Sequence, residues 1–290
     1  DIDLSGGQVT ANLTMRTATD TGWLVTADDI SVNDYETSIS PPVKVDPNPS
    51  AEAKLQILLP GETHQPGTEE GKSGVPITQT AGVTFTVTVN ACDIYWNIVD
   101  DDVIVELDTT DEFDTEPVAM SLGDGSAQFN LTLVTASTHT VSAHYVSAED
   151  YDYAPYTTPV FTVNPNDATK LQVLLPGETA VPGSSTGKTG VPDTQTAGVE
   201  FWITVNAVDD YWNVNTAAEA FVQIETTDPF DTEPTPQSLT DGTKVFPVTL
   251  VTNSTATYLT ANDTDTDPLN SNTSAAVAVN PNTPTKLQVL

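Results

Sequence analysis

Basic side chains are scarce in this sequence, and their scarcity argues against whole classes of partner. Eight lysines and arginines stand against 41 aspartates and glutamates, which gives the 290-residue chain a formal net charge of −33. Nucleic acids bind clustered cations that neutralise phosphates, and anionic membrane surfaces attract basic segments. The composition therefore disfavours both partners. The excess carboxylates also repel one another in a compact protein, so bound cations would relieve that repulsion.

Cysteine and long apolar runs are scarce as well. The single thiol, Cys92, allows no disulfide within the chain, and its counterpart in the internal repeat described below is Val208. We therefore expect Cys92 to be a small core residue and not a reactive thiol. The sequence has no apolar run long enough to cross a bilayer, no signal peptide and no initiator methionine. We expect a processed or excised piece of a longer protein.

A long internal repeat organises the chain. "KLQILLPGET" begins at Lys54, "KLQVLLPGET" at Lys170 and "KLQVL" at Lys286, so each anchor lies 116 residues after the previous one. Between the anchors, the same features recur in the same order: "GKSGVPITQTAGVTF" and "GKTGVPDTQTAGVEF", an aromatic motif, "TTDEFDTEP" and "TTDPFDTEP", then "FNLTLVTAST" and "FPVTLVTNST". This period exceeds that of short solenoid repeats and matches a whole β domain.

The units are cut at both ends of the chain. "GGQVTANLTMRTAT" from Gly6 to Thr19 matches "DGSAQFNLTLVTAS" from Asp124 to Ser137, so the chain opens in the middle of a unit. We predict the C-terminal half of a unit at 1–50, full units at 51–166 and 167–282, and the first strand of a further unit at 283–290. These limits favour a segment of a longer tandem array, and a permuted domain is the alternative. "NPND" and "NPNT" predict short, stiff joints between units.

Each unit is predicted to consist of β-strands. Although acidic chains are often disordered, 38% of these residues are hydrophobic and they alternate with polar ones, which is typical of half-buried strands. No stretch has helical periodicity. The sequence therefore predicts an all-β protein of tandem sandwiches. The residues expected to face the core are Phe85, Val87, Val89, Ala91, Val103, Val105, Leu107, Phe129, Leu131, Leu133, and Phe201, Ile203, Val205 and Ala207 in the second copy.

These segments resemble a known family. "FTVTVNACDIYWNIV", "TTD", a "DG" turn, "FNLTLVTAST" and a late "TVSAHYV" are similar to bacterial immunoglobulin-like repeats, the tandem modules of invasin- and intimin-type adhesins and other large surface proteins. The resemblance covers nearly the whole chain. That family often has glycine before the asparagine of the aromatic turn, where this chain has Trp96 and Trp212. The resemblance implies immunoglobulin-like β-sandwich spacers displayed outside a cell.

The aromatic turn occurs twice, as "NACDIYWNI" at 90–98 and as "NAVDDYWNV" at 206–214. Its Asp93 and Asp209 suit acceptance of backbone N–H bonds, and its Asn97 and Asn213 suit a left-handed backbone. Two aromatic residues precede the asparagine of each turn, and we expect one of each pair to pack on the sandwich end while the other projects. We predict a contact with the next module or a neighbouring chain, with a sugar ring as the alternative; the residues are Tyr95, Trp96, Tyr211 and Trp212.

Clusters of acidic residues are candidate cation sites. Calcium takes six to eight oxygen ligands, often from loops. Neither the twelve-residue helix-loop-helix calcium motif nor the nonapeptide calcium repeat is present here. Plain surface acidity is the simpler interpretation. If calcium binds, the "D-x-F-D-T-E-P" pair is favoured because it recurs whole, and its expected ligands are Asp111, Asp114, Glu116, Asp228, Asp231 and Glu233.

A Gly/Pro-rich loop contains "GKS" in one copy and "GKT" in the other. The glycine spacing of a phosphate-binding loop is not met and no parallel α/β unit surrounds it, so we reject nucleotide binding. Long loops inside compact domains are often functional. We expect Lys72 and Lys188, two of very few cations, to pair with acids of an adjacent module.

Catalysis has little support, because His64, His139 and His144 have no histidine counterparts in the second copy. We predict a non-enzymatic extracellular rod that serves as a stalk, fibre or filament and contacts copies of itself or adjacent repeats. The half unit could be completed by strand addition from another chain, or its missing half could precede it in one polypeptide. The alternative function is an adhesin that binds carbohydrate or a host protein through exposed aromatics and loops.

Overall fold

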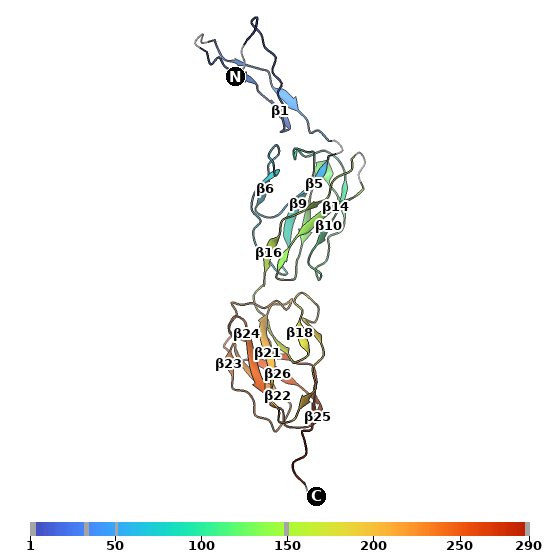
Figure 1. Ribbon diagram of the computed structural model, residues 1–290, viewed down its shortest axis with the longest axis vertical. Coiled ribbons are helices and arrows are strands. Elements are labelled where there is room, and N and C mark those ends of the chain that lie inside the picture. The colour runs from blue at the N-terminus through green and yellow to red at the C-terminus, as the bar shows by residue number, and fades with distance from the viewer. Residues whose placement is uncertain (1–3, 32–34, 50–51, 148–150, 288–290) are drawn as a thin grey trace.

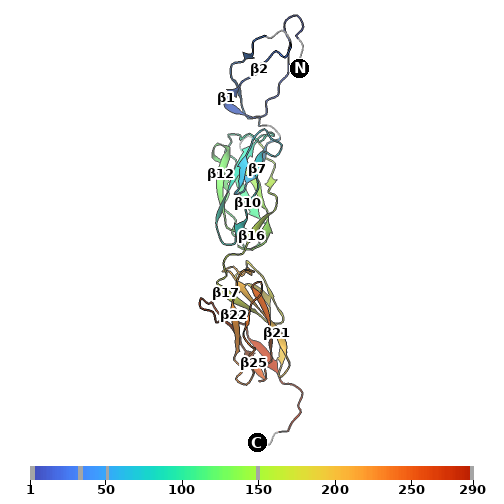
Figure 2. The same cartoon turned by 90° about the vertical axis from the view of Figure 1, so that its left-hand side faces the viewer.

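The computed structural model describes residues 4–31, 35–49, 52–147 and 151–287. These residues form three bodies in a row, with the two ends of the chain at opposite ends of the molecule (Figures 1 and 2). We call residues 1–50 the N-terminal segment, 51–166 the first module and 167–282 the second module. No helix among the described residues has the length and apolar character needed to cross a bilayer.

Two antiparallel sheets form the first module. One sheet has the order β12-β9-β5 and the other has the order β11-β10-β14-β15. A third group, β13-β16-β8, pairs β16 in parallel with β8 and antiparallel with β13, and β6 and β7 form a separate hairpin. The strands are β5 (Lys54–Leu58), β6 (Glu62–His64), β7 (Lys72–Gly74), β8 (Gln79–Thr80), β9 (Phe85–Cys92), β10 (Ile104–Thr109), β11 (Met120–Ser121), β12 (Ser126–Leu131), β13 (Thr138–His139), β14 (Val141–Ser147), β15 (Tyr156–Thr157) and β16 (Phe161–Asn164), with a 3-10 turn at Gly123–Gly125.

The second module repeats this topology. Its sheets are β17-β21-β24 and β23-β22-β26-β27, its third group is β20-β28-β25, and its hairpin is β18-β19. The strands are β17 (Lys170–Leu174), β18 (Glu178–Ala180), β19 (Lys188–Gly190), β20 (Gln195–Thr196), β21 (Phe201–Val208), β22 (Phe221–Thr226), β23 (Gln237–Ser238), β24 (Thr243–Val248), β25 (Ser254–Thr257), β26 (Leu259–Asp263), β27 (Asn272–Thr273) and β28 (Val277–Asn280).

Alternation along the strands builds one core in each module. Along β9, the inward residues from Phe85 to Ala91 are buried, whereas the outward Thr86 is exposed. One buried apolar cluster runs from Ala53 to Val163 and a second from Leu171 to Val279. Two sheets packed face to face around such a core are the immunoglobulin-like sandwich that the sequence predicts. The expected all-β, tandem immunoglobulin-like fold is confirmed.

The thiol of Cys92 lies in this interior, at the end of β9. Its side chain is fully buried, and burial raises its pKa to about 12, so the reactive thiolate is suppressed at neutral pH. The expectation of a small core residue is confirmed.

The N-terminal segment has two short antiparallel pairs: β1 (Thr19–Trp23) with β4 (Val43–Val45), and β2 (Thr26–Ala27) with β3 (Ser38–Ile39). None of its described residues is buried. Tyr35 is 68% exposed, whereas its repeat counterpart Tyr153 is 1% exposed. Side chains that fill the core of a full module are therefore open to solvent here.

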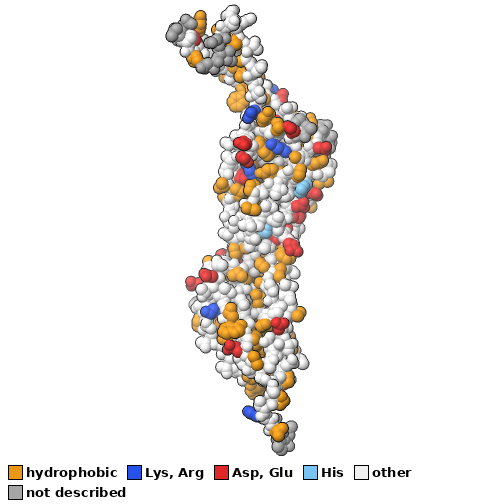
Figure 3. All heavy atoms as spheres, viewed as in Figure 1, with side chains coloured by type: hydrophobic (Ala, Val, Ile, Leu, Met, Phe, Trp, Pro, Cys, Tyr) orange, Lys and Arg blue, Asp and Glu red, His pale blue; other side chains and the backbone are white. Residues whose placement is uncertain are grey.

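Carboxylates are spread over the surface of both modules, with few lysines and arginines between them (Figure 3). No single acidic face is evident in this view. The excess charge is distributed along the length of the molecule.

Candidate functional site

The aromatic turns lie where successive bodies meet, and a buried aspartate holds each turn. Asp93, just after β9, accepts hydrogen bonds at Oδ1 from the N–H groups of Tyr95 (2.8 Å) and Asn97 (2.9 Å). Asp209 holds the second turn through the N–H groups of Tyr211 and Asn213, both at 2.9 Å. Both carboxylates are almost completely buried, so these N–H groups compensate their desolvation.

The left-handed residue of each turn is tryptophan, with φ of 67° at Trp96 and 69° at Trp212. The sequence analysis placed this conformation at the following asparagine, so that expectation is wrong. A bulky residue at positive φ is strained, and the surrounding structure must compensate for the cost. The tryptophan stands where the resembling family often has glycine.

Each indole packs on its own module. A Cβ placed on Gly71 would overlap the ring of Trp96, and one on Gly187 would overlap that of Trp212, so each ring lies against glycine backbone. On the aromatic face, the ammonium of Lys54 lies 3.5 Å from the Trp96 ring centroid, and that of Lys170 lies 3.6 Å from the Trp212 centroid. Each tryptophan is thus the aromatic of its pair that packs on its own module.

The tyrosines reach the neighbouring body. The ring of Tyr211 lies against Gly82 of the first module, where an added Cβ would overlap it. The guanidinium of Arg16, from the N-terminal segment, lies 5.5 Å from the centroid of Tyr95. Within each aromatic pair, the tyrosine is thus the residue at the joint.

The turn asparagine makes the most direct connection between the two modules. The Nδ2 of Asn213 donates to the carbonyl of Val134 (2.8 Å), and its Oδ1 accepts from the N–H of Ala136 (2.7 Å). The same Nδ2 also donates to Oδ2 of Asp209 at 2.9 Å. One amide therefore links the buried carboxylate of one module to the backbone of the other.

The same bonds recur at the first joint. Asn97 donates to the carbonyl of Arg16 (2.8 Å) and accepts from the N–H of Ala18 (2.7 Å). The linkers are bound alike, since Asn48 and Asn166 donate their N–H to the turn aspartates, each at 3.0 Å. We call this set of bonds around the turn aspartate and asparagine the clamp.

Asp111, expected as a calcium ligand, supports the loop that the clamp binds. Its carboxylate accepts the N–H groups of Val134 (2.6 Å) and Thr135 (2.7 Å) and the Thr135 hydroxyl (2.7 Å). Burial by itself would raise the pKa of Asp111, but these hydrogen bonds outweigh it and hold the pKa below its ordinary value. Asp228 binds Val251 and Thr252 in the same way.

The other expected calcium ligands form hydrogen bonds within their own loops. Asp114 accepts the hydroxyl of Thr109 (2.9 Å), and Glu116 accepts its N–H (2.7 Å). Asp231 and Glu233 do the same at Thr226, at 2.8 Å each. Burial raises the pKa of all four. Within the described ranges, no three acidic, histidine or cysteine side chains are placed to hold a metal. Calcium binding stays a prediction from composition.

The lysines of the Gly/Pro-rich loops bind acids of their own hairpins. Lys72 Nζ lies 2.7 Å from Glu62 Oε1, and Lys188 Nζ lies 2.9 Å from Glu178 Oε1. The expected ion pairs with an adjacent module are therefore replaced by pairs across β6-β7 and β18-β19. The loops still touch the previous body, but through backbone: Gly67 lies against Thr17 of the N-terminal segment.

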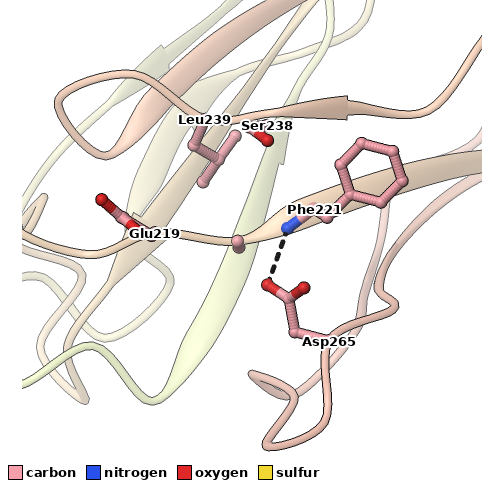
Figure 4. Close-up of a pocket in the computed structure, with 6 residues that line it drawn as sticks. Glu219, Phe221, Ser238, Leu239 and Asp265 are labelled. Carbon is pink, nitrogen blue, oxygen red and sulfur yellow. Dashed lines mark hydrogen bonds between the residues drawn. The ribbon is translucent and has the colours of Figure 1, made fainter.

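Surface depressions offer little chemistry. One is lined by Glu219, Ala220, Phe221, Ser238, Leu239 and Asp265, beside β22 and β23. Figure 4 shows its two carboxylates apart, with that of Asp265 turned to the N–H of Phe221 at 3.0 Å. No base is paired with the Ser238 hydroxyl among these lining residues. A second depression lies at the joint itself and includes Pro165, Pro182 and Asn213.

Sequence reasoning missed the asparagine clamp and the loop anchored by Asp111. Both had a signal, because the Asp-x-x-x-Asn spacing and the aspartate of "TTD" are retained in both copies. A tight turn by itself requires only some of these residues. The presence of the others in both copies indicated that they bind a segment outside the turn.

No family model and no curated protein matches the chain. Among solved structures, it is similar to the D0-D1 domain of intimin, with 13% identity, a TM-score of 0.26, and coverage of 70% of this chain and 93% of that one. It is similar to domains 5-6 of the S-layer protein SbsC at 15% identity and a TM-score of 0.23, covering 70% and 93%. A putative membrane anchored protein from Corynebacterium diphtheriae matches at 13% identity and a TM-score of 0.32, covering 91% of this chain and 60% of that one. The fold assignment rests on the sheet topology of this chain.

Proposed function

We propose that this chain is part of an extracellular or cell-surface rod, in which tandem immunoglobulin-like modules are held in line by specified joints. The observation that carries the proposal is the clamp, which occurs with the same bonds at both joints of the chain. A passive string of domains needs no such repeated set of contacts. The role proposed is structural and not catalytic.

Two features of the joints favour stiffness. The linker between the modules contains Pro165, which restricts the backbone, and Asn166, whose N–H and carbonyl are both bound, the carbonyl by Asn215 Nδ2 at 2.9 Å. Because repeat arrays gain stability from their cores and from the interfaces between neighbours, each clamp adds to stability as well as direction. Like charges along the surface keep separate rods apart in solution.

The distance between nitroxide labels at Val75 and Val191 tests the joint. The two sites are repeat counterparts, both are 75% exposed, and replacing Cys92 with its counterpart valine removes the native thiol. We expect one narrow distance distribution from pulsed electron paramagnetic resonance. The Asn213→Ala variant should broaden it, because about 1 kcal/mol is lost for each hydrogen bond and the partner groups are left unpaired.

The matched control is Asn262→Ala, which removes a partly exposed asparagine whose side chain bonds within its own module, to Glu225. Its distribution should stay narrow. A broad distribution in the parent chain, or a narrow one in Asn213→Ala, would refute a clamp-defined rod.

An adhesin that binds carbohydrate or a host protein is the second candidate function. The solvent-exposed aromatics that would serve it include Trp202 at 56% and Phe230 at 77%, in place of the packed Trp96 and Trp212. A glycan array read with Trp202→Ala as comparison tests this candidate, and binding lost in that variant would favour it over the rod.

A further inference from the structure

The far end of the second module carries the residues of a joint, but it carries them uncovered. Val134 of the first module, whose carbonyl is clamped, is 8% exposed, whereas its counterpart Val251 is 43% exposed. Phe113 is 37% exposed beside the Gly183 loop, whereas its counterpart Phe230 is 77% exposed. The two faces are alike in sequence and differ in whether a module lies on them.

The uncovered loop already has the clamped conformation. Asp228 accepts the N–H groups of Val251 (2.7 Å) and Thr252 (2.8 Å) and the Thr252 hydroxyl (2.6 Å). These distances match those from Asp111 to the occupied loop within about 0.1 Å. The loop therefore needs no reorganisation to bind an asparagine side chain, which reduces the entropic cost of docking.

A place for the tyrosine ring is also present. Gly82 and Gly198 hold their loops alike, since each donates its N–H to the carbonyl of a buried leucine at 2.8 Å. The ring of Tyr211 lies on Gly82, whereas the space over Gly198 is empty to 4 Å. Both glycines have φ of 75°, so a glycine is needed there for the backbone as well as for the ring.

The linker after the second module is held by the same kind of hydrogen bond as the linker before it. Asn282 Nδ2 donates to the carbonyl of Ala197 (3.1 Å), as Asn166 Nδ2 does to Ala81 (3.3 Å). The spacing from Asn280 to Lys286 equals that from Asn164 to Lys170. A module that starts its first strand at Lys286 would thus stand where the second module stands relative to the first.

We propose that Gly198, Phe230, Val251 and Asn253 form a socket for the Asp-x-Tyr-Trp-Asn turn of a further module of this kind, joined through residues 280–286. The incoming asparagine donates to the carbonyl of Val251 and accepts from the N–H of Asn253, and the incoming tyrosine covers Gly198. This inference rests on the proposed function.

A second copy of this chain is the less suitable occupant. Both of its own turns are engaged, Asn97 by the N-terminal segment and Asn213 by the first module. A separate molecule also lacks the linker N–H that completes the clamp, and it adds the repulsion of another net charge of −33. The occupant is therefore a module in the same polypeptide.

The test lengthens the chain by one module. Residues 286–290 are replaced by a copy of residues 170–282, and nitroxides are placed at Val191 and at its counterpart in the appended copy, with Cys92 changed to valine. We expect the same narrow distance as between Val75 and Val191, and about tenfold slower hydrogen exchange at the Asn253 amide than in the unextended chain. Changing the appended counterpart of Asn213 to alanine should abolish both effects, and changing the counterpart of Asn262 should abolish neither.

The outcomes separate this inference from the proposed function. A broad distance distribution at the new joint, together with a narrow one between Val75 and Val191, overturns the socket and leaves the proposed rod function intact. Broad distances at both joints overturn both proposals. Concentration-dependent association of the unextended chain that Phe230→Ala removes would assign the face to a second copy, which also overturns the socket as stated.

Discussion

Replacing Trp212 tests how a bulky residue is retained in a left-handed turn. The indole lies against Gly187 and under the ammonium of Lys170, and the residue itself is partly exposed. Full truncation of a buried tryptophan costs about 3–5 kcal/mol, so a partly exposed one should cost about 2 kcal/mol. Loss of the cation–π contact adds about 0.5–1 kcal/mol. We expect Trp212→Ala to destabilise the second module by about 2–3 kcal/mol.

Trp212→Gly should be less damaging than Trp212→Ala, which reverses the usual order. Alanine keeps the strain of a φ near 69°, whereas glycine adopts it freely, a difference of about 1 kcal/mol. At Trp202, an exposed residue within β21, the order should be the usual one, with glycine about 0.5–1 kcal/mol worse than alanine. The sign of the difference between glycine and alanine thus distinguishes the two sites.

Differential scanning calorimetry of the four variants measures these differences, since about 1 kcal/mol shifts the Tm of a domain of this size by roughly 3–5 °C. The label distance between Val75 and Val191 should remain narrow in Trp212→Ala, because Tyr211 and Asn213 make the joint. A Trp212→Gly variant less stable than Trp212→Ala would refute the strain argument. Unchanged stability in both would refute the packing argument.

Four further outcomes are expected. Asp228→Asn should lower the stability of the second module at pH 7 by about 2 kcal/mol, because a charge-assisted acceptor of four hydrogen bonds is weakened. Since the folded pKa of Asp228 is depressed, its contribution is present above pH 4 and is lost as the pH falls further; urea titrations from pH 2 to 7 should therefore show a flatter acid limb in the variant. Glu233 has a raised pKa, so Glu233→Gln should leave stability at pH 7 within about 0.5 kcal/mol, and a large loss would contradict this. Ellman's reagent should react with Cys92 only after unfolding, and Cys92→Val should change stability by less than about 1.5 kcal/mol. Calcium at millimolar concentration should leave Tm unchanged, because the carboxylates of Asp111 and Asp228 already accept protein donors; a clear rise in Tm would instead support the calcium site predicted from the sequence.

The fold could be predicted because period-two alternation directly reports a sheet with one buried face. Phe85, Val87 and Val89 could face nothing but a core, and the second copy repeated them. The roles within the turn could not be predicted in the same way. Asparagine tolerates positive φ better than tryptophan does, so local preference pointed to Asn97, yet its amide is needed by the neighbouring backbone. Contacts with the neighbouring body determine which residue of the turn takes the left-handed conformation. These contacts cannot be inferred from the sequence of one unit alone.

The partners of the lysines and the structural role of Asp111 could not be predicted for a related reason. An acidic surface makes every carboxylate resemble a cation ligand and every lysine a partner for another module. Burial changes this, because a nearly buried Glu62 or Asp111 must be paired within reach of its own loop. The nearest donors were therefore a hairpin lysine and backbone N–H groups, and neither has a signature in composition.

A clamp made of one amide and two backbone groups suits a rod better than an apolar interface. An apolar module end would associate non-specifically whenever it lacked a neighbour. In a chain of several modules, it would also bind any of them in many orientations. The clamp requires a donor and an acceptor at set positions, so a rotated neighbour leaves the buried amide of Asn213 or Asn97 without its backbone partners. The relative orientation of two modules is then fixed because a misoriented contact costs free energy, while the contact itself remains small. The open Phe230 and Val251 are the apolar part of such an end, limited to two side chains on a surface whose charge discourages association with other molecules.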